Sequence, residues 1–143
     1  MCWKTKLSIR AEAKKAYSPV KVFKVCKKMD DHVLSYYFSQ EYEVGKTYRL
    51  DNGLKFNTDD YIYNRTYHIY QGFHSYSPEK IKIRQVKHGM ADVKTKEGVV
   101  LDYYDFENIV RMDCIIPEGS VYYENENGEF VSDIIRIDSI EQI

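Results

Sequence analysis

The sequence predicts a single α+β domain, in which a mainly antiparallel sheet carries one or two short helices. Apolar runs rich in β-branched and aromatic residues recur along the chain, which is typical of strands. Asn-Gly pairs and prolines separate these runs, and one segment near Ser77 carries helix-start signals. A length of 143 residues is within the usual size of one domain, so residues 1–143 are expected to form one unit.

The first half of the chain reads as an antiparallel meander. Pro19 precedes a predicted strand at 20–26, and a second apolar run at 33–38 follows after a polar loop, which predicts a hairpin. A short strand ends at Leu50, before the tight-turn pair Asn52-Gly53. Residues 59–70 mix tyrosine and histidine with polar residues and follow neither the helix period nor the strand period, so a loop is expected there.

A helix is predicted to begin at Ser77. Ser77 suits the N-cap, Pro78 the first helical position and Glu79 the positive end of the helix dipole. This helix would end by Gly89. A strand remains the alternative, because Ile81, Ile83 and Val86 partly follow a period of two.

The rest of the chain returns to strands. Apolar residues gather around Val93 and at 99–101, then at 109–116, and a last strand is predicted at 129–137. Turns are expected at Pro117 and at Asn127-Gly128 between them. We expect the strands at 20–26, 109–116 and 129–137 to share one antiparallel sheet.

Charge and composition narrow the classes of partner. The formal net charge of −1 gives no general attraction for long nucleic acid. No apolar stretch approaches the roughly 20 residues that cross a bilayer, and the polar, lysine-rich residues 1–17 lack a signal-peptide core. We therefore expect no membrane association and a cytoplasmic protein, in the host cytoplasm if a phage encodes it.

The cysteines and histidines match no metal or disulfide pattern. Cys2, Cys26 and Cys114 are widely spaced and odd in number, and His32, His68 and His88 have no partner at metal-ligand spacing. We expect no metal and no cofactor. Cys26 and Cys114 lie in predicted apolar strands, so they are expected to be reduced and buried.

Tyrosine is abundant, with 14 in the chain and several in adjacent pairs. On a strand, one ring of each pair faces each side, so half must lie at a surface, an interface or a pocket. Tyrosine stacks on purine rings, and Arg65, Arg84 and Arg111 are candidates to hold phosphates. The alternative is packing against a sister subunit, which predicts a homo-oligomer, and both interpretations are compatible.

The segment Gly72–Ser77 is the predicted ligand site. His74 can donate, accept or act as a base near neutral pH, or it can simply hydrogen-bond its own turn. Tyr76 can stack on a base, Gly72 permits close backbone approach, and a helix after Ser77 would direct free N–H groups at a phosphate. The predicted ligand-binding residues are Phe73, His74, Ser75, Tyr76, Arg84 and Tyr122.

Three segments carry a resemblance to a known family. They are Met1-Cys2-Trp3-Lys4-Thr5-Lys6, Gly72-Phe73-His74-Ser75 and Cys114-Ile115-Ile116-Pro117-Glu118-Gly119-Ser120-Val121-Tyr122-Tyr123. Together they resemble a family of small, largely uncharacterised proteins of bacteriophages and of Bacteroides-type gut bacteria.

A second, partial resemblance is to ADP-ribosyltransferases, in which Ser-Thr-Ser precedes a helix and a late glutamate acts on the nicotinamide ribose. Here Tyr76 replaces the threonine of that motif, and Glu129 or Asp133 stands in no Glu-x-Glu arrangement. This resemblance implies a nucleotide-sized cleft.

Three functions follow from these observations. The favoured one is capture of a small nucleotide immune signal, such as a cyclic nucleotide or an ADP-ribose derivative, which blunts host defence. The second is an enzyme that cleaves or transfers part of such a nucleotide, with His74 as acid or base and Glu129 or Asp133 stabilising positive charge. The third is an oligomeric interaction protein without a small ligand, anchored by tyrosines.

Overall fold

The computed structural model of the chain describes residues 5–8, 12–30, 32–35, 40–57 and 66–143. Within these ranges the fold is all-β and contains no helix. No helix long and apolar enough to cross a bilayer is therefore found in the described residues. The strands are β1 (Thr5–Ser8), β2 (Lys14–Lys15), β3 (Val20–Met29), β4 (His32–Ser35), β5 (Glu41–Tyr42), β6 (Thr47–Arg49), β7 (Lys55–Asn57), β8 (Thr66–Gln71), β9 (Phe73–Tyr76), β10 (Ile81–Lys87), β11 (Met90–Thr95), β12 (Val100–Asp105), β13 (Ile109–Ile116), β14 (Val121–Glu124), β15 (Glu129–Ser132) and β16 (Ile134–Gln142).

The α+β prediction is wrong because the segment after Ser77 does not form a helix. A single turn closes when the Ile81 N–H donates to the Ser77 carbonyl at 3.0 Å, and the chain then extends into β10. Ile81 is buried and Ile83 is half-buried in the core, so the period-two alternative describes this segment. Helix-start signals stabilise only the first turn of a helix, whereas burial of two alternate isoleucines stabilises the whole strand.

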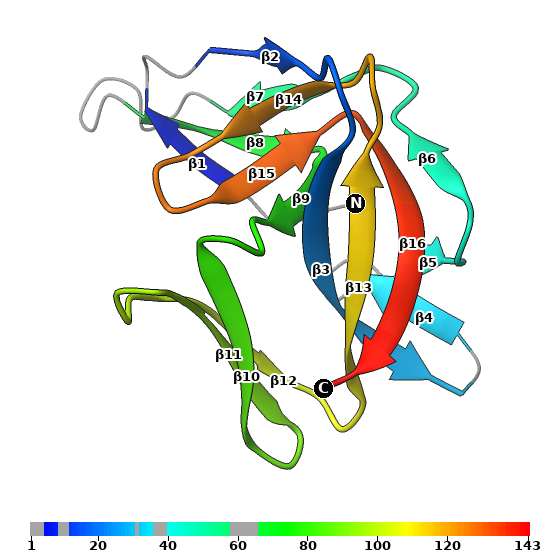
Figure 1. Cartoon of the computed structure of the whole chain (residues 1–143), viewed down its shortest axis with the longest axis vertical. Coiled ribbons are helices and arrows are strands. Elements are labelled where there is room, and N and C mark those ends of the chain that lie inside the picture. Colours follow the sequence, from blue (N-terminus) through cyan, green and yellow to red (C-terminus); the bar gives the residue numbers. More distant parts are fainter. Residues whose placement is uncertain (1–4, 9–11, 31, 36–39, 58–65) are drawn as a thin grey trace.

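A large bent sheet forms the body of the molecule, with strand order β2-β14-β15-β9-β3-β13-β16-β6 and with β4 and β5 attached beside β3 (Figure 1). Its centre is the antiparallel pair β3 and β13, in register from Val20 opposite Ile116 to Lys27 opposite Ile109. The prediction that residues 20–26, 109–116 and 129–137 contribute strands to one antiparallel sheet is confirmed.

The strand predicted at 129–137 is two strands, however. Asp133 separates β15 from β16, which pair with different neighbours. The Asp133 carboxylate accepts a hydrogen bond from the Val121 N–H at 2.9 Å, and its own N–H donates to the Val121 carbonyl at 3.1 Å. These bonds fix the break.

Two three-stranded sheets flank the large one, with orders β1-β8-β7 and β10-β11-β12. The loop prediction for 59–70 is wrong from Thr66 onward, because β8 pairs with both β1 and β7. The remainder of that prediction lies outside the described residues. The predicted hairpin of 20–26 with 33–38 is present as β3 and β4, with Met29 opposite His32, although 36–38 lie outside the description.

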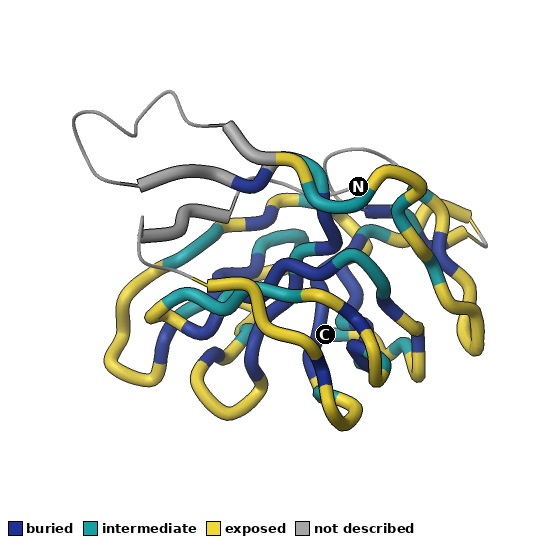
Figure 2. The backbone as a smooth tube through the Cα atoms, turned by 90° about the horizontal axis from the view of Figure 1, so that it is seen from above, coloured by how far each residue is buried: buried dark blue, intermediate teal, exposed yellow. Residues whose placement is uncertain are grey.

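The core has separate parts because β3 and β13 bury both of their faces. One cluster includes Val22, Cys26 and Cys114 and lies on one face of the large sheet. Phe23 and Val25 face the other way and pack with residues of β10, β11 and β12. Figure 2 shows the buried residues along the central strands and the exposed residues on the connecting loops.

Cys26 and Cys114 form no disulfide and are buried, with exposed fractions of 0% and 1%. The prediction of two reduced, buried thiols is therefore confirmed. Burial raises the pKa of the Cys114 thiol far above its usual range, so the group stays protonated. Cys2 lies outside the described residues.

Candidate functional site

The predicted ligand segment forms β9, a strand inside the large sheet between β15 and β3. Its side chains alternate between the two faces of the sheet. Phe73 is buried in the cluster that contains Cys114, whereas Tyr76 is buried in the cluster between the large sheet and β10–β12. The Ser75 hydroxyl is buried and has no hydrogen-bond partner among the described residues. The segment is thus divided between two core regions.

His74 is held inside the fold by its ring and its main chain. Its Nε2 lies 3.2 Å from the carbonyl oxygen of Ile69, so this nitrogen carries the proton and donates. Burial, followed by the nearby positive charge of Lys24, lowers the pKa of His74 well below its usual value. The imidazole is therefore neutral at pH 7 and bridges the turn between β8 and β9.

Lys24 is a buried cation beside β9 that sequence reasoning missed. Its side chain is 6% exposed, and its Nζ donates to the His74 carbonyl at 2.5 Å and lies 5.7 Å from the centroid of the Tyr42 ring. The alternation of residues along the strand could have identified this buried lysine. Lys24 has the same parity as Val22 and Cys26, so it faces the core, whereas Lys21 faces solvent.

The other predicted ligand residues lie apart. Tyr122 on β14 is half-buried and packs on Phe130, with ring centroids 5.7 Å apart. Tyr122 and Phe73 are both registered opposite Ser132, one on each side of β15. Arg84 is exposed on β10, in a different sheet, with its Nη2 3.7 Å from the Asp92 carboxylate. The structure therefore brings Phe73 and Tyr122 to one face of the sheet and leaves Arg84 elsewhere.

The two acidic residues considered for catalysis lie at opposite ends of β15. Glu129 is registered opposite Tyr76, and its carboxylate accepts a hydrogen bond from Asn125 Nδ2 at 3.0 Å. Burial raises the pKa of Glu129, and the nearby Asp102 carboxylate adds to this rise. Asp133 fixes the break before β16, as described above. Glu129 is on the same sheet face as His74, because it is registered opposite Tyr76.

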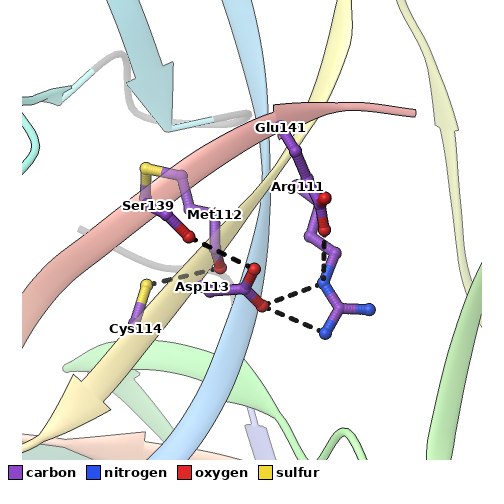
Figure 3. A network of polar contacts seen from close by, with 6 residues as sticks. All are labelled: Arg111, Met112, Asp113, Cys114, Ser139 and Glu141. Carbon is purple, nitrogen blue, oxygen red and sulfur yellow. Dashed lines mark hydrogen bonds and ion pairs between the residues drawn. The ribbon is translucent and has the colours of Figure 1, made fainter.

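Arg111, a candidate phosphate ligand, has carboxylate partners within the fold. Its guanidinium lies 4.3 Å from the centroid of the Phe23 ring, and its Nε and Nη2 each lie 3.0 Å from Asp113 Oδ1. Glu141 adds a third contact at 3.7 Å, and Ser139 donates to the other oxygen of Asp113 at 3.4 Å (Figure 3). The positive charge of Arg111 is thus compensated by protein groups. Arg65 lies outside the described residues.

Among the pockets that described residues line are the following two, and no predicted ligand residue lines either of them. The first has a volume of about 240 Å³, and we call it the sheet-end pocket. It is lined by Gln85, His88, Gly89, Met90, Ala91, Phe106, Glu107, Asn108, Ile109, Gln142 and Ile143. The second measures about 400 Å³ and lies between the β11–β12 and β14–β15 turns. It is lined by Glu79, Lys80, Thr95, Lys96, Glu97, Val99, Glu126 and Asn127.

Comparisons of the chain with protein-family models, with curated proteins and with solved structures find no match. The chemistry of the two pockets is therefore the basis for a function. All residues that line the larger pocket except Thr95 are exposed, and its acids and lysines alternate in sign. A ligand on such a surface would stay largely in contact with water.

The sheet-end pocket has a different lining. Three residues with amide side chains, Gln85, Asn108 and Gln142, stand among the apolar Met90 and Ile109 and the aromatic Phe106. The Lys27 ammonium lies 5.6 Å from the centroid of the Phe106 ring. This combination of a ring, amides and a nearby cation makes the pocket the better candidate site.

Main-chain hydrogen bonds hold the walls of the sheet-end pocket. The Phe106 N–H donates to the Gly89 carbonyl at 2.8 Å, which ties the β12–β13 connection to the β10–β11 turn. The Lys28 N–H donates to the Asn108 carbonyl at 2.8 Å, which ties the same connection to β3. Contacts within the protein thus hold these walls in place.

Among the described residues, no group of three or more histidine, cysteine, aspartate or glutamate side chains is arranged to hold a metal ion. His32 instead lies 2.5 Å from a Glu41 carboxylate oxygen on the neighbouring strand, and His88 is an exposed residue of the sheet-end pocket.

The neutral His74 gives a pH-dependent stability that can be measured. As the pH falls below about 6.5, the unfolded chain binds a proton at this imidazole and the folded chain does not, so stability decreases. The decrease is at most about 1.4 kcal/mol per pH unit. We expect urea unfolding between pH 7.5 and 5.5 to show a steeper loss in the wild type than in His74→Gln.

The comparison between wild type and His74→Gln also removes the contribution of Glu129 to the pH dependence of stability. Its raised pKa acts in the opposite direction, because the folded state binds that proton first as the pH falls. This contribution is the same in both proteins and cancels in the difference. Parallel pH profiles for wild type and His74→Gln would show that the folded imidazole titrates normally.

Proposed function

We propose that the protein binds a small nucleotide through its base and sugar in the sheet-end pocket, and that it does so without altering the ligand. The lining of this pocket is the observation that supports the proposal. Asn and Gln side chains pair with the donor and acceptor edges of bases, and aromatic rings stack on base faces. Phe106 and the three amide-bearing residues supply these groups around one cavity.

A positive charge next to the pocket suits the phosphate end of such a ligand. The half-buried Lys27 lies against Phe106 at the end of β3. It stands outside the lining itself. A nucleotide with its base in the pocket would therefore direct its phosphate outward toward β3, where the Lys27 ammonium pairs with phosphate as a point charge.

The volume restricts the size of the ligand. Pockets for drug-sized molecules usually measure about 300–1,000 Å³, and the sheet-end pocket is smaller at about 240 Å³. This space suits one base with part of its sugar. The ligand class is therefore a mononucleotide, or the terminal nucleoside of a larger molecule such as an ADP-ribose derivative.

Capture of a host nucleotide signal is the biological role that we propose for this binding. A protein that retains its ligand intact lowers the free concentration of a signal in proportion to its own concentration. The role depends on tight retention and on the absence of turnover, and both can be measured directly.

The first experiment examines what the protein retains. Purified protein is incubated with adenosine, AMP, ADP-ribose and cyclic AMP in turn, desalted and denatured, and the released small molecules are identified by mass spectrometry. We expect intact ligand at up to one equivalent. Release of a cleaved or transferred product would replace capture with the enzymatic alternative, and absence of all four compounds would contradict nucleotide binding.

The second experiment locates the site. Phe106→Leu keeps an apolar side chain for the core but removes the aromatic face, so AMP binding should weaken by about 1–3 kcal/mol, the usual value of base stacking. Calorimetric titration measures this change. Equal affinity in Phe106→Leu and wild type would exclude the sheet-end pocket as the base site.

Lys27→Ala separates the two ends of the ligand. This variant should bind AMP more weakly but bind adenosine as the wild type does, because only AMP carries the phosphate. Lys21→Ala is the matched control, since Lys21 is an exposed lysine near the opposite end of β3. The same loss for adenosine and AMP in Lys27→Ala would contradict a phosphate contact.

A further inference from the structure

The small sheet β10-β11-β12 has two edges of opposite charge. β10 forms one edge and carries Lys82, Arg84 and Lys87 without an acidic residue. β12 forms the other edge and carries Asp102 and Asp105 without a basic residue. In the described part of the chain, neither strand pairs with any strand except β11. Both edges therefore present main-chain groups that another strand can pair with, although on β12 the Tyr103 N–H already donates to Asp102 Oδ1 at 2.8 Å.

Apolar side chains are exposed on the same two strands. Val86 on β10 is 48% exposed, and Val100 and Tyr103 on β12 are 54% and 46% exposed. Exposed edges in monomeric proteins usually avoid such side chains, because they promote pairing with another chain. In Figure 1 this sheet lies at the lower left, and one of its faces packs on the large sheet.

The register of the sheet sets the two edges at the same level. Lys87 and Asp105 are both paired with Met90 of β11, and Arg84 and Tyr103 are both paired with Asp92. β10 and β12 run in the same direction, since each is antiparallel to β11. A second copy in the same orientation would thus place its Lys87 beside Asp105 and its Arg84 beside Tyr103.

We propose that the β10 edge of one molecule pairs with the β12 edge of a second copy of this chain. The charges select this arrangement. Pairing of β10 with β10 would oppose lysines and arginine, and pairing of β12 with β12 would oppose aspartates, whereas β10 with β12 joins opposite signs. The contact is head-to-tail, so it generates rings or linear chains of molecules and not a closed two-fold dimer.

This inference is independent of nucleotide binding. It uses strand edges, whereas the proposed ligand occupies the sheet-end pocket. The test is self-association of the full chain, measured by sedimentation velocity across a concentration series at low and high salt. We expect the average mass to rise with concentration at 50 mM salt and to fall toward the monomer at 500 mM, as salt screens exposed charges.

Charge reversal examines the two edges separately. Lys87→Glu places a like charge opposite Asp105 of the next copy, and Asp105→Lys places a like charge opposite Lys87, so each variant alone should associate only at higher concentrations than the wild type. An equimolar mixture of the two variants restores opposite charges and should associate, as should the double variant. Lys21→Glu and Asp138→Lys are the matched controls, because both are exposed, lie on the large sheet and change the net charge equally.

The mixture also guards against a variant that fails to fold, because an unfolded partner cannot restore association. A wild type that remains monomeric throughout the series would overturn the inference. Association of Lys87→Glu or Asp105→Lys equal to that of the wild type would overturn it as well, as would loss of association in the two control variants.

Discussion

Phe23→Ala is expected to lower the free energy of unfolding by about 3–5 kcal/mol, the usual cost of truncating a buried phenylalanine. Phe23 is fully buried in the cluster that joins the large sheet to β10–β12. Its ring lies 5.4 Å from the Tyr76 ring centroid and 4.3 Å from the Arg111 guanidinium carbon. Removal of the ring would leave a cavity between the two sheets, because Phe23 is enclosed by other core residues.

Urea unfolding followed by circular dichroism measures this loss. Tyr103→Ala is the matched control, because Tyr103 is an aromatic residue on the outer side of β12 and is 46% exposed. Its truncation should change stability by less than about 0.5 kcal/mol, as is usual at the surface. A loss below 1 kcal/mol in Phe23→Ala would mean that the two sheets do not depend on this ring for their packing.

The central strands could be predicted because their sequences are apolar on both faces. In β3, Val22 and Cys26 face one cluster and Phe23 and Val25 face the other, so the segment is a nearly continuous apolar run. Such runs identify buried strands independently of their neighbours. The same reasoning located β13 and its buried Cys114.

The errors arose where distant contacts decide the local structure. Ser77, Pro78 and Glu79 carry helix-start signals, but the pairing of Ile81 with Thr95 and Ile83 with Val93 draws the following residues into a sheet. Similarly, nothing in the apolar run at 129–137 marks the break, because Asp133 is fixed by the main chain of Val121, twelve residues earlier. Local propensity cannot report such contacts.

The sheet-end pocket could not have been predicted from any one segment. Its walls come from the β10–β11 turn, the β12–β13 connection and the end of β16, which meet only in the folded chain. His88 has no partner at metal-ligand spacing in the sequence, yet it is exposed and lines this pocket. A histidine beside a glycine in a hairpin turn gives no signal of what lies across from it.

Gly72 illustrates the same limitation, because the close approach inferred from its sequence context is an approach to the core. A Cβ atom at this position would lie 2.3 Å from Val131 Cγ2 and 2.8 Å from Leu54 Cδ2. The φ angle of Gly72 is outside the left-handed region, so the effect of a side chain there is purely steric. We therefore expect Gly72→Ala to destabilise the fold by about 3 kcal/mol, the upper part of the range for overpacked cores.

The contact with Val131 is the cause to be tested, since Val131 is fully buried and Leu54 is half-buried with a flexible end. Val131→Ala removes the clashing methyl group, so Gly72→Ala should cost at least about 1 kcal/mol less in that background than in the wild type. Urea unfolding of the four proteins of this double-mutant cycle measures the difference. An equal cost in both backgrounds would show that the backbone of β9 shifts to accommodate the new methyl group, and that the packing of β9 against β15 is looser than these distances indicate.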